Sequence, residues 1–409
     1  MDAATFAIVV PPDVTRFVES DIAGRPAGEY LFEALAKLDG VDVRVLSDST
    51  MPSRAEPNKR YGVVRFPLTA ADASALAERD VLIVDARAWL PDVLLSSVLS
   101  RARRTGGNLR LVDSSVDRAG RMAMTLALYF ARGRLRPDSL ERAQTTAGRG
   151  LEHVLSAESL TEGVLVAAPD LDIDEPALLV DSYPALSKIE RLVLLDRANS
   201  AMERGVRIRD PHQVWLRGDL VCGSDVELEI NVIVEGTVVL GNGVRIGANC
   251  VLRDSRIGDN TRINPFSLVE HASIGSDGIV GPYSRIRPAS TIADAVQIGN
   301  YVEIKNSEVG SRSRINHHAF IGDAVIAEDV TVGAGTITCN HDGVRINRTI
   351  VERGAYIGSG CNLVAPVRIG QGATIGAGST ITRDVPAAKL TLARSRQTTI
   401  PNWRGPKRS

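Results

Sequence analysis

An aliphatic residue recurs at every sixth position through much of the second half of this chain. The longest such ladder comprises Ile274, Val280, Ile286, Ile292, Ile298 and Ile304. Glycine often follows the aliphatic residue, as in Ile246-Gly247 and Ile357-Gly358. A period of six is neither the helical period nor the strand alternation, and it is typical of a left-handed parallel β-helix of hexapeptide repeats. We expect the branched side chains to stack in its core, and Gly or Asn to take the corner dihedrals that other residues avoid.

The hexapeptide pattern also predicts the limits of this region and one interruption in it. The pattern begins near Val206, continues to about Thr382, and breaks once, at Thr338–Thr349. A break in a solenoid is usually a loop extruded on one face, and such loops tend to be functional. Prisms of this kind usually carry acyl transfer, at sites formed between neighbouring chains.

Residues 1–185 read as alternating strand and helix. Predicted strands are Ala7–Val10, Val41–Leu46, Val81–Val84, Leu109–Val112 and Gly163–Ala167, and predicted helices are Ala27–Leu38, Pro91–Arg104 and Arg121–Phe130. This order predicts a Rossmann-like α/β domain with a mainly parallel sheet. An amphipathic helix over residues 186–204, ended by Gly205, would connect the two parts. We therefore expect three segments: 1–185, the connector 186–205, and the β-helix with its tail, 206–409.

Composition excludes several classes of function. The net charge of −1 gives no bulk attraction to nucleic acid or to an anionic membrane, so neither is expected as a partner. No signal peptide is recognised and no apolar run is long enough to span a bilayer. Of the four cysteines, Cys222, Cys250 and Cys361 are expected as small apolar residues of the prism, and no C-x-x-C pair indicates zinc. A reducing cytoplasm is the expected compartment.

Several longer motifs resemble one family of enzymes. They are Leu216-Arg217-Gly218, Gly281–Pro288, Gly299–Lys305, Ile321–Ala324, Gly333–Asn340, Val364–Val367, Gln397-Thr398 and Trp403-Arg404. In this order they resemble the acetyltransferase half of the bifunctional UDP-N-acetylglucosamine pyrophosphorylase/glucosamine-1-phosphate N-acetyltransferase family. The resemblance covers roughly half the chain. It implies a homotrimer that uses acetyl-coenzyme A as co-substrate.

The resemblance also assigns catalytic roles. His317 matches the family's general base, and an imidazole is a side chain suited to removal of a proton from an attacking amine. Glu303 matches the glutamate that helps to orient this histidine, and Asn340 the asparagine that holds the reacting amine. Ala334 matches the residue whose backbone N–H faces the thioester oxygen, where an oriented donor would stabilise an oxyanion. The alternative for His317 is a histidine on a prism face without a role, and His318 has no motif support.

Three further residues match the family's coenzyme positions: Ser359, Ala377 and Arg394. Small side chains would let the arm of coenzyme A approach the backbone, and an arginine can make a forked contact with phosphate. The alternative for Arg394 is a solvated charge in the tail.

The predicted acceptor pocket departs from the family pattern. Arg287 and Lys305 match its cations for a sugar phosphate and favour an anionic acceptor. Phe320 stands where the family has a tyrosine, and Thr331 where it has an asparagine. His341 stands where the family has a tyrosine directly after the residue that Asn340 matches. A site that hydrogen-bonds a substrate hydroxyl discriminates strongly against ligands that lack it. These changes predict that the reaction is kept and the amine acceptor is altered.

The first half resembles a sugar-phosphate nucleotidyltransferase that has lost its phosphate-binding loop. Such enzymes place glycines after the first strand, whereas the segment Val9–Arg16 has none and contains two prolines, which lack the N–H donors that the loop needs. Asp85 matches a magnesium ligand, but Val180–Pro184 offers no counterpart of the second ligand. We expect no nucleotide transfer, treat magnesium dependence as doubtful, and interpret Asp85 as a remnant or a capping residue.

Four functions therefore compete. The first is an acetyl-coenzyme A-dependent N-acetyltransferase of an amino sugar, with or without a phosphate, beside an inactive nucleotidyltransferase-like domain. The second is a bifunctional enzyme with both halves active, which the Val9–Arg16 segment disfavours. The third is an N-acyltransferase of a non-sugar amine in a specialised pathway. The fourth is a trimeric scaffold without catalysis, which the joint retention of His317, Glu303, Asn340 and Arg394 disfavours.

Overall fold

The computed structural model describes residues 5–10, 21–23, 25–46, 64–66, 76, 78–106, 108–112, 125–131, 134, 164–166, 177–180, 182–401 and 403. The chain divides into two compact units, Met1–Val193 and Leu194–Ser409. The division falls within a long helix, α7 (Tyr183–Glu203), which begins three residues before the connector helix expected from the sequence. Gly205, with φ of +95°, follows its end. None of the helices in the described ranges is long and apolar enough to cross a membrane.

The first unit is built on a seven-stranded sheet. Its strands, in spatial order, are β10 (Val164–Val166), β8 (Leu109–Val112), β9 (Thr125–Phe130), β6 (Val81–Asp85), β1 (Thr5–Val10), β4 (Val41–Leu46) and β5 (Val64–Phe66). The helices α1 (Ala27–Ala36) and α3 (Asp92–Thr105) accompany it, with short strands β2 (Asp21–Ile22), β3 (Arg25–Pro26), β7 (Ala88–Trp89) and β11 (Leu178–Leu179). All pairs except those of β9 are parallel within this sheet, which confirms the predicted α/β domain.

The prediction of a helix over Arg121–Phe130 is wrong where the structure describes it. Thr125–Phe130 forms β9, antiparallel to both β6 and β8, and residues 121–124 lie outside the described residues. The side chains of Leu126–Phe130 are all buried. A short uninterrupted apolar run does not separate helix from strand by periodicity, and here two neighbouring strands satisfy its backbone groups on both sides.

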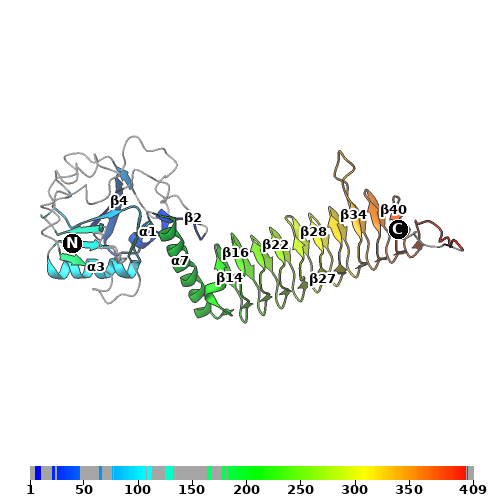
Figure 1. The fold of residues 1–409 in the computed structure, drawn as a ribbon, viewed down its shortest axis with the longest axis horizontal. Coiled ribbons are helices and arrows are strands. Elements are labelled where there is room, and N and C mark those ends of the chain that lie inside the picture. The colour runs from blue at the N-terminus through cyan, green and yellow to red at the C-terminus, as the bar shows by residue number, and fades with distance from the viewer. Residues whose placement is uncertain are drawn as a thin grey trace, which may run out of the picture. The chain divides into compact units, whose positions relative to one another are not determined.

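The second unit is a parallel β-helix with three faces (Figure 1). The first face contains β12 (Arg207–Ile208), β15 (Glu227–Leu228), β18 (Arg245–Ile246), β21 (Arg262–Ile263), β24 (Ile279–Val280), β27 (Gln297–Asn300), β30 (Arg314–His317), β33 (Thr331–Val332), β36 (Tyr356–Ile357), β39 (Thr374–Ile375) and β41 (Leu390–Thr391). The second contains β13 (Trp215–Leu216), β16 (Ile233–Glu235), β19 (Val251–Arg253), β22 (Leu268–Glu270), β25 (Arg285–Ile286), β28 (Glu303–Lys305), β31 (Phe320–Gly322), β34 (Ile337–Cys339), β37 (Asn362–Val364) and β40 (Thr380–Ile381).

The third face contains β14 (Asp219–Cys222), β17 (Thr237–Leu240), β20 (Arg256–Ile257), β23 (Ala272–Ile274), β26 (Ser290–Ile292), β29 (Glu308–Val309), β32 (Ala324–Ile326), β35 (Thr349–Val351) and β38 (Val367–Ile369). A 3-10 turn, Pro211–Gln213, lies between β12 and β13. We call the edge between the first and second faces the first corner, and the edge between the second and third faces the second corner. Each coil thus passes both corners in order.

The predicted aliphatic ladder forms the core of the β-helix. Ile274, Val280, Ile286, Ile292, Ile298 and Ile304 are each at most 2% exposed. Cys250 and Cys361 are buried among them, as predicted, whereas Cys222 is half-buried at the edge of the core. Because every third repeat returns to the same face, residues one coil apart stack in columns, as Ile263, Val280 and Ile298 do.

The prediction that Gly or Asn takes the corner dihedrals is wrong in part. Asn231 and Asn249 do lie at positive φ, but so do Phe266, Tyr283 and Tyr301. The glycines that follow an aliphatic residue have another reason for their identity. A Cβ on Gly247 would lie 2.7 Å from the backbone nitrogen of Pro265, and one on Gly358 2.5 Å from that of Ala377. These glycines are therefore required by the close approach of successive coils.

The predicted interruption is a loop between β34 and β35, visible as the orange segment that projects beside β34 (Figure 1). Thr338 and Thr349 lie in the flanking strands, so the loop spans residues 340–348. An isolated antiparallel bridge joins His341 to Ile346. At the tip, Val344 is 87% exposed. The break in period therefore marks an extruded loop, as the sequence predicted.

Candidate acyl-transfer site

The first corner aligns the predicted base with all the predicted coenzyme contacts. His317 ends β30, and the Gly335 N–H of the next coil donates to the carbonyl oxygens of His317 and His318 at 3.3 and 2.9 Å. Ala334 and Ser359 occupy the same corner in the following two coils, joined by the hydrogen bond from the Gly360 N–H to the Ala334 carbonyl oxygen. The larger sequence separation between Ala334 and Ser359 arises because the loop of residues 340–348 intervenes.

His317 is exposed at this corner and has a defined hydrogen-bond partner. Its Nδ1 lies 2.8 Å from the Oδ1 of Asn300, one coil earlier. Because an amide oxygen only accepts, this contact requires the proton on Nδ1 and leaves a lone pair on Nε2. The imidazole is thereby held in the tautomer that a general base needs.

Beyond His317 the first corner carries backbone donors and little side-chain bulk. The N–H groups of Ala334, Ser359 and Ala377 donate to no other group in the described part of the chain. Each of these residues is followed by a glycine at positive φ, as at Gly335 with +74°. A narrow strip with free backbone donors results, and a long ligand can approach the backbone along it.

Arg394 lies at the end of this strip. Its Nη1 donates to the carbonyl oxygen of Ala377 at 2.9 Å. The side chain is exposed and makes no ion pair with a described residue. One nitrogen thus anchors the guanidinium to the corner, and the remaining N–H groups are available to an anion such as a phosphate.

Three predicted acceptor-site residues, Arg287, Lys305 and Phe320, lie on the outer surface of the second face together with Glu303. Glu303 pairs with Phe320 across β28 and β31, and Lys305 pairs with Gly322. Arg287 follows β25, the preceding strand, and its Nη1 donates to Glu303 Oε1 at 2.8 Å. The Nε of Arg287 is buried without a hydrogen-bond partner. The structure therefore brings these residues together in three successive coils.

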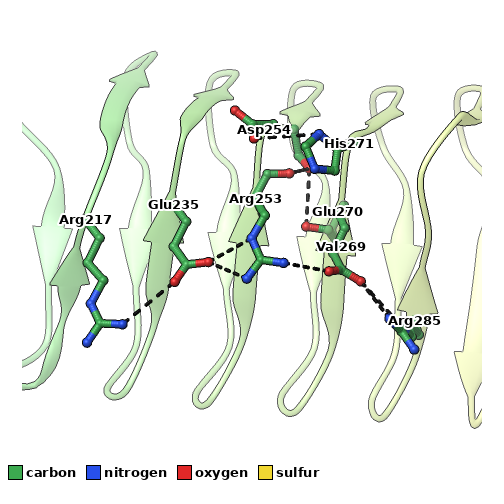
Figure 2. Close-up of polar contacts among 9 residues, drawn as sticks. Arg217, Glu235, Arg253, Asp254, Val269, Glu270, His271 and Arg285 are labelled. Atoms are coloured by element: carbon green, nitrogen blue, oxygen red, sulfur yellow. Dashed lines mark hydrogen bonds and ion pairs between the residues drawn. The ribbon is translucent and has the colours of Figure 1, made fainter. Parts of the chain in front are cut away.

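The second face carries an alternating ladder of charges in the earlier coils (Figure 2). Glu235 accepts from Arg253 and forms an ion pair with Arg217 at 3.8 Å, and Glu270 accepts from Arg253 at 2.8 Å and from Arg285 at 3.1 Å. Glu235, Arg253 and Glu270 are stacked in register. Such cross-strand pairs stabilise a sheet.

The alternation of charge stops at the candidate site. Arg253 and Glu270 belong to a column of residues stacked one coil apart. In the next two coils this column contains Arg287 and then Lys305, so two cations follow each other. Lys305 is half-buried, and its ammonium group makes no ion pair with a described residue. Like charges in adjacent strands are destabilising, so this break leaves a local excess of positive charge that an anion can neutralise.

The predicted role of Glu303 as the partner of His317 has no support in a single chain. The Glu303 carboxylate binds Arg287, and the Nδ1 of His317 binds Asn300 instead. Glu303 belongs to a strand of the second face, whereas His317 lies at the end of a strand of the first face. Within one chain Glu303 orients Arg287.

Asn340 lies at the second corner, on the other side of the second face from His317. Its Nδ2 donates to Asp323 Oδ2 at 2.5 Å, and Asn306 donates to the other oxygen of the same carboxylate at 2.5 Å. This orientation leaves the Oδ1 of Asn340 as an acceptor. The second face separates the two residues, because His317 lies before β31 and Asn340 lies after β34, the next strand of that face.

The remaining predicted acceptor contacts are dispersed. Thr331 lies on β33 of the first face, paired with Arg314 and Tyr356, and not on the face that carries Phe320. His341 is exposed in the loop, where its Nδ1 accepts the Gly343 N–H at 3.2 Å. In a single chain, neither side chain joins the cluster on the second face.

The loop that carries His341 is held by one carboxylate. Asp342 Oδ1 accepts the N–H groups of Arg345 and Val344 at 2.6 and 2.9 Å, and its Oδ2 accepts from Asn347 at 3.0 Å. These hydrogen bonds lower the pKa of Asp342 to about 2, and the hydrogen bond from the Arg345 N–H makes the largest contribution. The turn is therefore ordered by hydrogen bonds to an ionised carboxylate.

Sequence reasoning missed two residues of the candidate site, Asn300 and Asp323. Asn300 precedes His317 by 17 residues, and Asp323 precedes Asn340 by 17. This separation is one coil of the β-helix at these corners. A search for polar side chains one coil before each predicted site residue would have found both.

In the first unit, Asp85, which matches a magnesium ligand of the nucleotidyltransferases, binds an arginine. Both oxygens of Asp85, at the end of β6, accept from Arg87: Oδ1 from Nε at 3.0 Å and Oδ2 from Nη2 at 2.8 Å. Asp85 is 4% exposed, so the guanidinium occupies the place where a cation would bind the carboxylate. These residues do not fit a magnesium site. Residues 11–16 and Asp181, on which other predictions rest, lie outside the described residues.

Sequence comparison places the chain beside known proteins. Residues 348–383 match the model of the bacterial transferase hexapeptide family, which has six repeats. The chain is 46% identical over 248 residues to the bifunctional protein GlmU of Azoarcus sp. (strain BH72), covering 61% of this chain and 55% of that protein. It is 46% identical over 297 residues to that of Bordetella petrii, covering 72% and 65%.

The chain spans about half of the length of most of the curated relatives it matches. Among solved structures, the 2-C-methyl-D-erythritol 4-phosphate cytidylyltransferase of Thermus thermophilus is 19% identical and covers 47% of this chain and 99% of its own, with a TM-score of 0.32. A likeness at this level has no weight for the fold or function of this chain. The relatives nevertheless confirm that the chain resembles the bifunctional pyrophosphorylase/N-acetyltransferase family, over part of the chain and part of those proteins.

Proposed function

We propose that this chain is an acetyl-coenzyme A-dependent N-acetyltransferase that acts on an amino sugar carrying a phosphate. The observation that carries the proposal is the first corner. There His317, with Nε2 free, is followed by three unpaired backbone donors and then by the anchored guanidinium of Arg394. A base, a strip for a flexible arm and a cation for its phosphates follow one another in the order that this reaction needs.

The chemistry assigned to the corner is a single acyl transfer. The neutral amine nitrogen attacks the thioester carbonyl carbon while Nε2 of His317 takes the proton of the amine. The backbone N–H of Ala334 stabilises the oxyanion that forms. The carbon–sulfur bond then breaks, the acetyl group stays on the amine as an amide, and the sulfur takes up a proton to leave as free coenzyme A.

The break in the charge ladder supports an anionic acceptor. Arg287 and Lys305 would bind its phosphate, since two adjacent cations lack a full complement of carboxylates there. Phe320, next to them, presents an apolar ring to the sugar. We assign Asn340 the attacking amine, because its free Oδ1 can accept an N–H of that group.

We also propose that the site is completed by a neighbouring copy in a homotrimer. His317 and Asn340 lie at opposite corners of the second face, so one chain does not bring both to the same amine. A second copy packed along this face would supply the missing group. Thr331, His341 and Glu303, which lie apart from the acceptor or base in one chain, would then have a place at the site.

The proposal includes an inactive first unit. The forked contact of Arg87 with Asp85 supports it, because the carboxylate is already neutralised. Release of pyrophosphate from UTP and a sugar 1-phosphate would favour the bifunctional alternative instead. The same assay with Arg87→Ala distinguishes a site blocked only by Arg87 from one that has lost its other parts as well.

The test of the transferase is release of free thiol from acetyl-coenzyme A with the purified full chain. A panel of amines would include glucosamine 1-phosphate, glucosamine 6-phosphate and unphosphorylated glucosamine. We expect turnover with a phosphorylated amino sugar. Turnover only with a non-sugar amine would overturn the acceptor class, and absence of coenzyme binding in calorimetry would favour the scaffold.

A further inference from the structure

The third face carries an open hollow of about 410 Å³ that the proposed reaction does not use. It extends over four consecutive coils, from β17 to β26. The lining side chains that matter are Thr237, Asp254, Arg256, His271, Ser273 and Thr291. Its volume lies within the range of small-molecule sites, roughly 300–1,000 Å³.

The register of the coils explains why a hollow forms here. On the third face, Arg256, Ser273 and Thr291 stack in one column. Ala289, at the second corner, lies in the same coil as Thr291. Ser273 and Ala289 have some of the smallest side chains, so they leave space, while Arg256 and His271 border it with longer ones. The hollow is thus built by stacked positions of rigid coils.

Arg256 contributes an uncompensated positive charge to the hollow. Its guanidinium is exposed and makes no ion pair with a residue that the structure describes. Its column neighbours are Val239 and Ser273, and neither is anionic. Three residues earlier in the same coil, Arg253 binds both Glu235 and Glu270 on the second face (Figure 2). Two arginines of one coil therefore differ in charge compensation according to the face on which they lie.

The acidic group of the hollow is already engaged. Asp254 Oδ1 accepts the backbone N–H of Thr237 at 2.9 Å, and Oδ2 lies 3.6 Å from Nδ1 of His271 (Figure 2). The carboxylate thus faces the imidazole and a backbone donor and forms no ion pair with Arg256. The negative charge of Asp254 is therefore engaged by other groups that line the hollow, and the Arg256 guanidinium remains available to a ligand.

Among the serine and threonine hydroxyl groups near the Arg256 guanidinium, those of Ser273 and Thr291 are available as donors and those of Ser255 and Ser290 are not. The hydroxyls of Ser255 and Ser290, which are buried, donate to the backbone carbonyl oxygens of Arg253 and Ile304 at 2.6 and 3.5 Å. The hydroxyls of Ser273 and Thr291 make no hydrogen bond within the described part of the chain. They lie next to each other in the column of Arg256 and can donate to the same ligand.

We propose that this hollow is a second ligand site, which binds a small hydroxylated phosphate monoester. The Arg256 guanidinium would make a forked contact with the phosphate, and the hydroxyls of Ser273 and Thr291 would donate to its remaining oxygens. The hydroxyl groups of the ligand would meet Thr237 and the imidazole of His271. The site lies on a different face from Lys305 and on earlier coils, so it binds independently of the acyl acceptor.

The test uses isothermal titration calorimetry of the full chain with glycerol 3-phosphate, a monoester without an amine. We expect binding to one site per chain, and none with glycerol. Arg256→Gln should weaken binding by about tenfold or more, the usual loss for a hydrogen bond to a charged group. Arg262→Gln, on the first face, is the matched control and should bind as the wild type does. Circular dichroism would verify that each variant folds.

Two further variants keep the result interpretable. Ser273→Leu fills the hollow while leaving the guanidinium in place, and should also abolish binding. Lys305→Gln should leave binding unchanged. Binding lost with Lys305→Gln but kept with Arg256→Gln would place the phosphate on the second face and overturn the proposal. Absence of heat with the wild type, or equal affinity for inorganic phosphate, would overturn the assignment of a monoester site.

Discussion

The two halves of the second face differ in how their charges are ordered. From β13 to β22, arginine and glutamate alternate along the face, and each cation meets a carboxylate one coil away. From β25 to β31, Arg287 and Lys305 follow each other, and the next positions in register are Gly322 and Cys339. The backbone is the same in both halves. The comparison teaches that paired charges can stabilise the stacking of coils in a repeat. A cation at one position where the alternation would place a carboxylate, here Lys305, leaves a positively charged surface that an anion can neutralise.

The largest effect is expected at the base. Replacing His317 with alanine should lower acetyl transfer by about 10²–10⁴-fold, the usual range for loss of a general base. His317 is exposed, so the thermal unfolding temperature should not change. His318→Ala, which removes the neighbouring imidazole, is the control and should retain activity. Equal loss in both variants would show that the corner, and not this base, was disturbed.

The break in the charge ladder is tested most sharply by a substitution that restores the alternation of charge. Lys305→Glu would place a carboxylate after Arg287 and continue the alternation. We expect the unfolding temperature to be at least that of the wild type. The kcat/KM for a phosphorylated amine should fall on the order of a hundredfold, because a charge-assisted contact becomes repulsive.

The kinetic readout of Lys305→Glu has two controls. An unphosphorylated amine should lose little activity in the same variant, since it makes no contact with this cation. Arg217→Gln, in the paired half of the face, should leave the KM of either amine unchanged. A stable Lys305→Glu protein with full activity would contradict the division of the second face into two halves.

The paired half should respond in stability and not in activity. Glu270 is 9% exposed and binds Arg253 and Arg285. Glu270→Gln should lower the free energy of unfolding by about 1–2 kcal/mol, because hydrogen bonds to a charged group are lost and two cations remain. Chemical denaturation measures this change. Glu308→Gln is the matched control: its pair with Arg348 is exposed on both sides and should contribute less than about 0.5 kcal/mol.

The smallest effect is expected in the loop and depends on pH. The pKa of Asp342 is lowered to about 2 by the hydrogen bonds it accepts, first from Arg345. Because the folded pKa is depressed, the ordering of the turn is fully present above the ordinary carboxyl pKa and is lost as pH falls towards 2. Hydrogen exchange at the Val344 and Arg345 amides should accelerate across this window. With Asp342→Ala these amides should exchange rapidly at all pH values.

Sequence predicted much of the candidate site because the β-helix is nearly one-dimensional. The resemblance assigned His317, Ala334, Ser359 and Ala377 to one reaction, and they lie on one corner because a fixed repeat converts sequence separation into position. The same rule would have found Asn300 and Asp323 from their 17-residue separations. The partner of Glu303 could not be read this way, because side-chain contacts depend on which face a residue occupies.

The first unit shows where periodicity is insufficient. β4 and β8 were predicted with their observed limits, since short buried strands with β-branched residues between turns are distinctive. The run Thr125–Phe130 was assigned to a helix, because a short apolar run has no period of its own. Its identity as a strand depends on pairing with β6 and β8, which lie outside the run itself.

The sequence by itself determined the β-helix, the buried aliphatic ladder and the extruded loop, because each follows from a local repeat or its interruption. Tertiary structure alone decided that Arg87 closes Asp85, that Asn300 holds His317, and that Arg253 is paired while Arg256 of the same coil is not. Those features depend on which side chains meet across coils and strands. Charge and hydrogen bonding act through space over a few ångströms, and a residue's neighbours at that range are set by the fold.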